Sequence, residues 1–109
     1  MSKPIYLKPA AELLGRILAG TLPADKQMEG YFRAHHEMGV RDRGAVAEMV
    51  YACLRRRRVL EHIAGGDRPD RTDTVAAYLL TQGLSARALA AGGYRGAAVA
   101  LAGRARTLA

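Results

Sequence analysis

Residues 41–64, RDRGAVAEMVYACLRRRRVLEHIA, form the longest segment of this chain with one clear hydrophobic period. Asp42 precedes the apolar pattern as an N-cap residue would, and the Gly-Gly pair at 65–66 follows it as glycine does past a helix C-terminus. We therefore predict one long helix over 41–64. Its apolar side chains recur every three or four residues, as on one face of an α-helix: Val46, Val50, Cys53, Leu54, Leu60 and Ala64.

Four consecutive arginines, beginning at Arg55, occupy the last turns of this predicted helix. With about 100° of rotation per residue, Arg57 projects near the middle of the apolar stripe and Arg55 on the opposite side. A charge on a buried stripe needs a partner, and Glu61, four residues on, is the nearest candidate, although a carboxylate elsewhere could serve instead. We interpret Arg57 as structural and the other three as available for binding. Alternatively, all four arginines simply solvate a helix end.

The segments on either side also show helical rather than strand patterns. The sequence has no run of alternating β-branched residues and no Asn-Gly or Asp-Gly turn, so hairpins are not expected. Residues 65–71 have the composition of a polar linker, and residues 92–109 read as a weak tail outside a regular core of about 8–91. Thr72 or Asp73 and then Ser85 are expected to cap the last two regular helices. Beside the long helix, we expect helices over about 8–19, 25–38, 73–82 and 85–91.

The length of 109 residues is just enough for one domain with a single core. Half of the residues are hydrophobic, which excludes wholesale disorder, whereas only 6% are aromatic. The core must therefore be aliphatic and rich in alanine, which suits close packing of helices. We predict an all-α fold, a bundle of five or six helices joined by short loops.

The formal net charge of +7 and the pI near 10.2 favour an anionic partner, of which nucleic acid is the commonest. Acidic lipid or an acidic protein would also fit this charge. Beyond Asp73 the sequence contains no acidic residue at all. The arginines of this C-terminal part are therefore unopposed in sequence: Arg87, Arg95, Arg104 and Arg106.

The sequence offers no catalytic or metal-binding pattern. The single cysteine, Cys53, lies on the apolar stripe, so we expect a small buried hydrophobe rather than a nucleophile. His35 and His36 point about 100° apart on a helix and cannot easily ligate one metal together. The N-terminus lacks the layout of a signal peptide, and no apolar run approaches 18 residues. We expect a cytoplasmic protein without a membrane contact.

The central stretch, GVRDRGAVAEMVYACLRRRRVLEHI, resembles the NusB-like domain that heads the Sun/Fmu (RsmB) family of ribosomal RNA cytosine-5 methyltransferases. The matching parts are the RDR start at 41–43 and the LRRRR run at 54–58 on one predicted helix. The preceding ADKQMEGYFRAHHEMG resembles the helix before it in that family. The resemblance covers about residues 8–64 well and 72–91 loosely.

The resemblance implies a single NusB-like helical domain over 1–109 that binds RNA. It also implies a parent enzyme that moves a methyl group from S-adenosylmethionine to cytosine in small-subunit ribosomal RNA. The catalytic domain of that family carries the cysteine pair and the cofactor loop, and we expect it to be absent from this chain, so no catalytic role passes to Cys53. Charge and placement on the predicted helix select these candidate RNA contacts: Arg41, Arg43, Arg55, Arg56 and Arg58.

Two function classes follow from these observations. The first is an RNA-binding accessory domain, whose partners would be ribosomal RNA and the C-terminal methyltransferase domain of the same parent protein. The second is a protein-interaction module of the transcription-antitermination or interdomain-docking type, in which the basic C-terminal part docks on a partner. Salt dependence separates the two, because phosphate contacts weaken steeply with salt and an apolar docking face does not.

Overall fold

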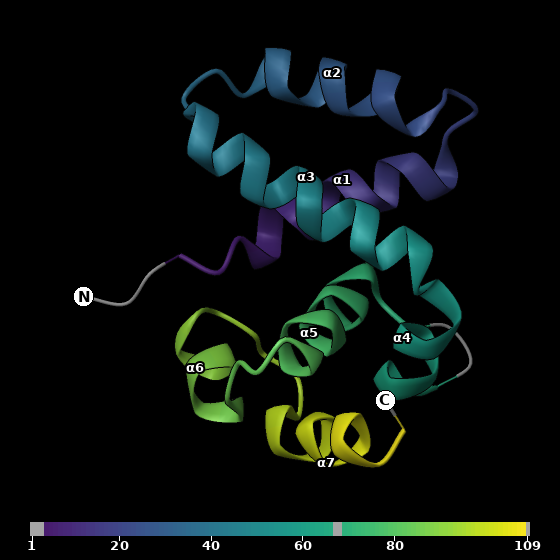
Figure 1. The fold of residues 1–109 in the computed structure, drawn as a ribbon, viewed down its shortest axis with the longest axis vertical. Helices are drawn as coiled ribbons and strands as arrows, with labels where there is room; N and C mark the ends of the chain where they lie inside the picture. The colour runs from purple at the N-terminus through teal and green to yellow at the C-terminus, as the bar shows by residue number, and fades with distance from the viewer. Residues whose placement is uncertain (1–3, 67–68, 109) are drawn as a thin grey trace.

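A computed structural model describes residues 4–66 and 69–108, and these residues form seven α-helices and no strand (Figure 1). The predicted all-α fold class is confirmed, although there are seven helices rather than five or six. Among the described residues, no helix is both long and apolar enough to cross a membrane. The helices are α1 (Leu7–Ala19), α2 (Ala24–Ala34), α3 (Val40–Arg55), α4 (Arg57–Ala64), α5 (Arg71–Thr81), α6 (Ala86–Ala91) and α7 (Ala98–Leu108).

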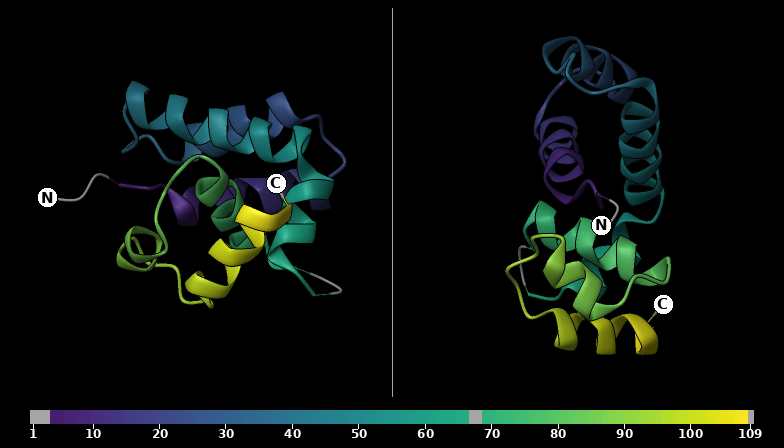
Figure 2. Two further views of the ribbon diagram at one scale, coloured as in Figure 1. Left: turned by 60° about the horizontal axis from the view of Figure 1, so that its bottom comes forward. Right: turned by 90° about the vertical axis from the view of Figure 1, so that its left-hand side faces the viewer.

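The helices form a flat bundle around α5. The molecule measures 37 × 35 × 19 Å, so its shortest dimension holds about two helices, each about 10 Å across. Helix α5 lies in the middle and packs against α1, α3, α4, α6 and α7 (Figure 1). Helix α2 lies at one edge, against α1, and α7 lies at the opposite edge (Figure 2). The central helix is therefore α5, not the segment with the clearest hydrophobic period.

Small side chains allow α5 to be surrounded in this way. Five consecutive residues of α5, from Thr74 to Tyr78, are buried, so this helix is buried all round rather than along one stripe. The only hydroxyl deep among them, that of Thr74, donates to the carbonyl oxygen of Asp70 at 3.3 Å. Asp70 also caps the helix by accepting from the Thr72 N–H at 3.2 Å, in place of the predicted cap at Thr72 or Asp73.

The predicted helix over 41–64 is wrong at Arg56, where the chain leaves helical geometry with φ −111° and ψ 24°. The Arg56 N–H still donates to the Ala52 carbonyl at 3.0 Å, and the Leu60 N–H donates to the Arg56 carbonyl at 3.0 Å. The break therefore bends the segment and leaves it continuous. It turns α4 so that Leu60 and Ile63 are fully buried in a helix that packs on α5.

The bend also changes the role predicted for Arg57. Its side chain is 47% exposed and does not lie on the buried stripe, so the interpretation of Arg57 as the structural arginine of the core is wrong. The predicted pairing is confirmed, because the Arg57 Nε donates to the Glu61 Oε2 at 2.8 Å. The apolar stripe itself is largely confirmed. Its buried members are Val46, Val50, Cys53 and Leu60.

Two predicted helix boundaries moved by a few residues, and a third is confirmed. Asp42 is the third residue of α3 and not its N-cap, and its carboxylate accepts from the N–H of Gly39, the N-cap residue, at 3.4 Å. Helix α2 ends at Ala34 rather than Met38, because His35 leaves helical geometry and its ring stacks on Tyr31 at 4.2 Å between centroids. The N-cap predicted for α6 is confirmed, since the Ser85 Oγ accepts from the Ala88 N–H at 3.0 Å.

The prediction of a weak tail over 92–109 is wrong, because α7 packs against α4, α5 and α6. Leu101 on this helix is almost fully buried. The guanidinium of Arg104 donates from Nε to the Ile63 carbonyl at 2.7 Å and from Nη2 to the Ala64 carbonyl at 3.2 Å. These carbonyls lie in the last turn of α4, where a helix leaves its acceptors without intrahelical partners. Arg104 is therefore a structural arginine.

We expect Arg104→Ala to lower the free energy of unfolding by about 1–3 kcal/mol, because two carbonyls of α4 lose their charged donor. Arg106→Ala on the same helix is the matched control and should cost under roughly 0.5 kcal/mol, since that side chain is exposed. Urea denaturation followed by circular dichroism measures both. Equal midpoints for the two variants would show that the Arg104 contact contributes nothing to α4.

A second long-range contact predicts a pH dependence of stability. The Tyr94 hydroxyl donates to the Asp73 Oδ1 at 2.7 Å, and burial, followed by this hydrogen bond, raises the pKa of Tyr94 above its usual value of about 10. Because the folded pKa exceeds the unfolded one, this contribution to stability is complete below about pH 10 and is lost as pH rises through the folded value.

We therefore expect Tyr94→Phe to be less stable than the parent near pH 7, by about 1 kcal/mol. The gap between the two proteins should narrow above about pH 10, where the parent loses the contribution of the phenol. Denaturant midpoints measured at a series of pH values test this directly. A gap that stays constant across the series would show that Tyr94 keeps an ordinary pKa.

Candidate nucleic-acid interface

The five candidate arginines lie in two groups on α3 and the start of α4. Arg41 and Arg43 lie in the first turn of α3, and Arg55, Arg56 and Arg58 surround its junction with α4. All are exposed except Arg56, which is half-buried. At a rise of about 1.5 Å per residue, Arg41 and Arg55 are about 21 Å apart along α3. A compact anion could not contact both groups, whereas a polynucleotide backbone could.

Helical rotation brings only some of these side chains to one face. Arg41 and Arg55 are fourteen residues apart, so they differ by only about 40° around the axis of α3. Glu48 lies seven residues from each, on the same exposed arc, and places a carboxylate between the two cations. Arg43 points about 160° away from Arg41 and does not share this face. The interface therefore has two positive ends and an acidic middle.

The arginines of the two groups differ in whether their side chains already bind another residue. Within residues 4–66 and 69–108, Arg41, Arg43, Arg55 and Arg58 take part in no ion pair. The nearby Asp42 carboxylate is engaged by the Tyr6 hydroxyl, which donates to Oδ1 at 2.6 Å. These exposed cations therefore keep their donors for a ligand.

Arg56 is the exception among the candidates. Its Nη1 donates to the Thr81 Oγ1 at 3.3 Å, across to the end of α5. The Thr81 hydroxyl itself donates to the Tyr78 carbonyl at 2.7 Å. Arg56 therefore ties the bend between α3 and α4 to α5, and only part of its guanidinium faces solvent.

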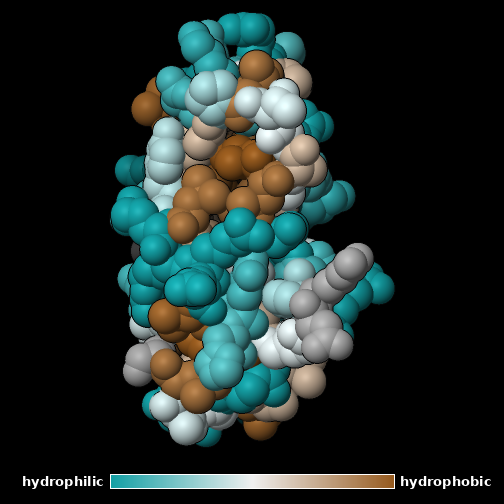
Figure 3. Space-filling view, turned by 90° about the vertical axis from the view of Figure 1, so that its right-hand side faces the viewer, coloured by the Kyte–Doolittle hydropathy of each residue, from teal (hydrophilic) through white to brown (hydrophobic). Residues whose placement is uncertain are grey.

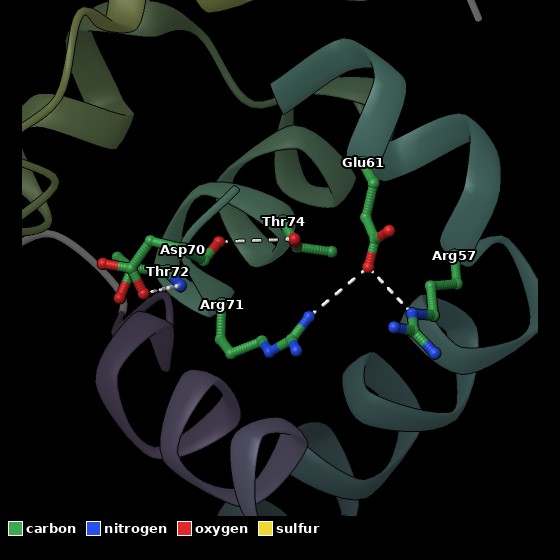
Figure 4. A network of polar contacts seen from close by, with 6 residues as sticks. All are labelled: Arg57, Glu61, Asp70, Arg71, Thr72 and Thr74. Carbon is green, nitrogen blue, oxygen red and sulfur yellow. Dashed lines mark hydrogen bonds and ion pairs between the residues drawn. The ribbon is translucent and has the colours of Figure 1, made fainter. Parts of the chain in front are cut away.

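Glu61 removes two further cations from the available set. Its Oε2 accepts from the Arg57 Nε at 2.8 Å and from the Arg71 Nη1 at 3.4 Å, so one carboxylate joins α4 to the start of α5 (Figure 4). Arg57 and Arg71 therefore already have a carboxylate partner. The α3–α4 junction lies on the side of the molecule that Figure 3 faces, where hydrophilic side chains form a band across the middle.

Sequence reasoning missed the roles of Glu48 and Arg104. The spacing of seven residues on either side of Glu48 is visible in the sequence and could have placed it between Arg41 and Arg55. The contact of Arg104 with α4 was not readable, because it joins residues about 40 positions apart. Of the four C-terminal arginines that are unopposed in sequence, Arg104 is therefore not available to a ligand, because its guanidinium binds the carbonyls of α4.

Another cavity of the structure is lined by basic residues, but it suits an anion less well. A cavity of about 810 Å³ beside the start of α5 contains Lys8, Arg71 and Arg95, but Glu12, Asp70 and Asp73 also line it and balance their charge.

Burial raises the pKa of the Cys53 thiol to about 12, so this cysteine stays protonated near neutral pH. Among the described residues, no three histidine, cysteine or acidic side chains gather as a metal site.

No family model, curated protein or solved structure matches this chain. The resemblance to NusB-like domains therefore stays a prediction, which the all-helical fold accommodates.

Proposed function

We propose that this chain is an RNA-binding domain that contacts phosphates through the exposed arginines at the two ends of α3. The observation that carries the proposal is that Arg41 and Arg55, which have no ion-pair partner among the described residues, lie about 21 Å apart on one face of a helix, in a chain of net charge +7. Guanidinium groups bind phosphate oxygens in pairs and stack on unpaired bases. Structured RNA offers phosphates at this separation.

The RNA is proposed to be ribosomal, and the domain to serve a methyltransferase domain that uses S-adenosylmethionine to modify cytosine. This part of the proposal rests on the resemblance of residues 8–64 to NusB-like domains. In that role the chain positions RNA and carries no catalytic group. Tyr51, 38% exposed, is the only aromatic on the same exposed arc of α3 as Arg55, so sequence preference should be slight.

We expect affinity for a ribosomal RNA hairpin to fall steeply between about 50 and 200 mM salt. Replacing Arg55 and Arg58 with glutamine should weaken binding at every salt concentration. It should also reduce the salt slope by roughly 1.5 to 2, because each lost phosphate contact removes nearly one released counterion. Arg56 is left in place, since its bond to Thr81 supports the fold. Fluorescence anisotropy titrations measure both quantities.

The matched control is the double variant Arg87→Gln and Arg95→Gln, which removes the same charge from exposed positions outside α3 and α4. It should leave the salt slope nearly unchanged. Equal losses of RNA affinity in the two double variants would mean that binding depends only on the net charge. The α3 surface would then not be the interface.

Glu48 supplies a test with the opposite sign. Because its carboxylate lies between Arg41 and Arg55 on the exposed arc, it repels a phosphate backbone that spans the two ends. Glu48→Gln should therefore tighten RNA binding, by roughly threefold to tenfold at low salt, where charge interactions are least screened. Glu12→Gln on α1, also exposed, is the control and should change affinity little. An unchanged affinity for Glu48→Gln would place the RNA elsewhere.

A protein-interaction module of the antitermination or interdomain-docking type is the second candidate function. The observation that favours it is an apolar groove beside α7, where Val99 is 78% exposed. Arg106, one of the arginines beyond Asp73, lines this groove. RNA binding remains the leading proposal, because the exposed arginines of α3 need no partner with a particular side-chain pattern.

A further inference from the structure

A groove of about 560 Å³ runs between the end of α5, the start of α6 and one side of α7. On one wall, Val99, Ala102 and Arg106 follow one another at helical spacing along α7. The opposite wall is formed by residues of α5, α6 and the loop between them, chiefly Leu80 and Leu84. Val99 is as exposed as any large apolar side chain of the described residues except Val40. The fold thus leaves this apolar groove open to solvent.

The charge around this groove has one sign. Among residues 4–66 and 69–108, Arg106 is the only charged residue that lines it, and no carboxylate side chain does. Thr81, which also lines the groove, accepts a hydrogen bond from Arg56, so a second guanidinium lies beside it. No acidic residue follows Asp73 in the sequence, so α6 and α7 carry none. A ligand that presents carboxylates beside an apolar surface would meet cations and no like charge.

We propose that this groove docks an acidic amphipathic helix of a partner protein or domain. Small side chains such as Ala102 let two helices approach closely, to within about 8–10 Å between axes. The described residues that line the groove include no aromatic side chain on which an unpaired base could stack, which favours a protein occupant over RNA. This inference does not rest on RNA binding by α3, because it uses a different surface, and it gives the second candidate function a site.

The dimensions of the groove define the occupant. Val99 and Arg106 are about 10 Å apart along α7, which corresponds to about two helical turns. The bound helix would place apolar side chains at positions i, i+3, i+4 and i+7 in the groove, as in other helix-in-groove complexes. Glutamate or aspartate on a flank of that stripe would face Arg106, and Arg56 lies close by at Thr81. A contact of this size is weak by itself and suits a domain tethered in the same assembly.

The test uses a designed helical peptide of about 14 residues, long enough to cover the groove, with leucines at the four apolar positions and glutamates on both flanks. A second peptide keeps the leucines and carries lysine in place of every glutamate. Backbone amide shifts of the labelled domain report where each peptide binds. The acidic peptide should shift residues of the groove, such as Thr81, Ser85 and Val99, and the basic peptide should bind at least about tenfold more weakly.

Val99→Asp is the decisive variant, because it adds a carboxylate to the apolar wall. It should weaken binding of the acidic peptide by about tenfold or more. Val40→Asp is the matched control: Val40 is 79% exposed, also lies in the first turn of a helix, and is outside the groove. Val40→Asp should bind the acidic peptide as tightly as the parent does. Circular dichroism of both variants checks that the fold is kept, which their exposure leads us to expect.

Three outcomes would overturn the proposal. The first is equal binding of the acidic and basic peptides, which would mean that the groove selects only apolar surface. The second is an equal loss in Val99→Asp and Val40→Asp. The third is a ribosomal RNA hairpin that shifts the groove residues while the acidic peptide does not. RNA shifts confined to α3 and α4 would leave the groove to the peptide and would support the assignment of two surfaces.

Discussion

The close packing of five helices around α5 is the constraint on which the rest of this structure depends. Five consecutive buried residues, Thr74 to Tyr78, leave that helix no solvent face in its middle. Three of the five are alanine or threonine, so neighbouring helices can approach on every side. The one deeply buried hydroxyl bonds back to its own helix, at the Asp70 carbonyl. A larger side chain at Ala76 or Ala77 would have to push a neighbouring helix away.

The bend at Arg56 follows from this arrangement. Helix α4, which follows the bend, packs on α5 and buries Leu60 and Ile63 in the core. The four arginines at 55–58 also point in different directions around the bend. Arg57 turns outward to Glu61, Arg56 turns toward Thr81 on α5, and the remaining two arginines of the run face solvent. The packing of apolar side chains on α5 thus decides which cations are left for a ligand.

The sequence predicted the fold class and most helices because local patterns carry that information. The stripe of Val46, Val50 and Cys53 and the Ser85 cap depend on neighbours within one turn, and both are confirmed. The bend and the order of α7 depend on distant residues. Arg104 caps α4 from about 40 positions away, and no local sequence pattern predicts such a contact. The placement of the arginines at two ends of one helix and the pairing of Arg57 with Glu61 were predictable from spacing, whereas the exposure of Arg57 was not.

Local charge, and not the net charge, governs what such a surface can bind. At physiological salt an exposed charge is screened beyond about 8 Å, so the two ends of α3, about 21 Å apart, act almost independently. Glu48 lies about 10 Å from each end and weakens binding only for a ligand whose charge passes over it. A continuous phosphate backbone does so, while a helix in the groove beside α7 does not. The same excess of arginine can therefore serve two ligands of different shape, each of which meets its own small set of cations.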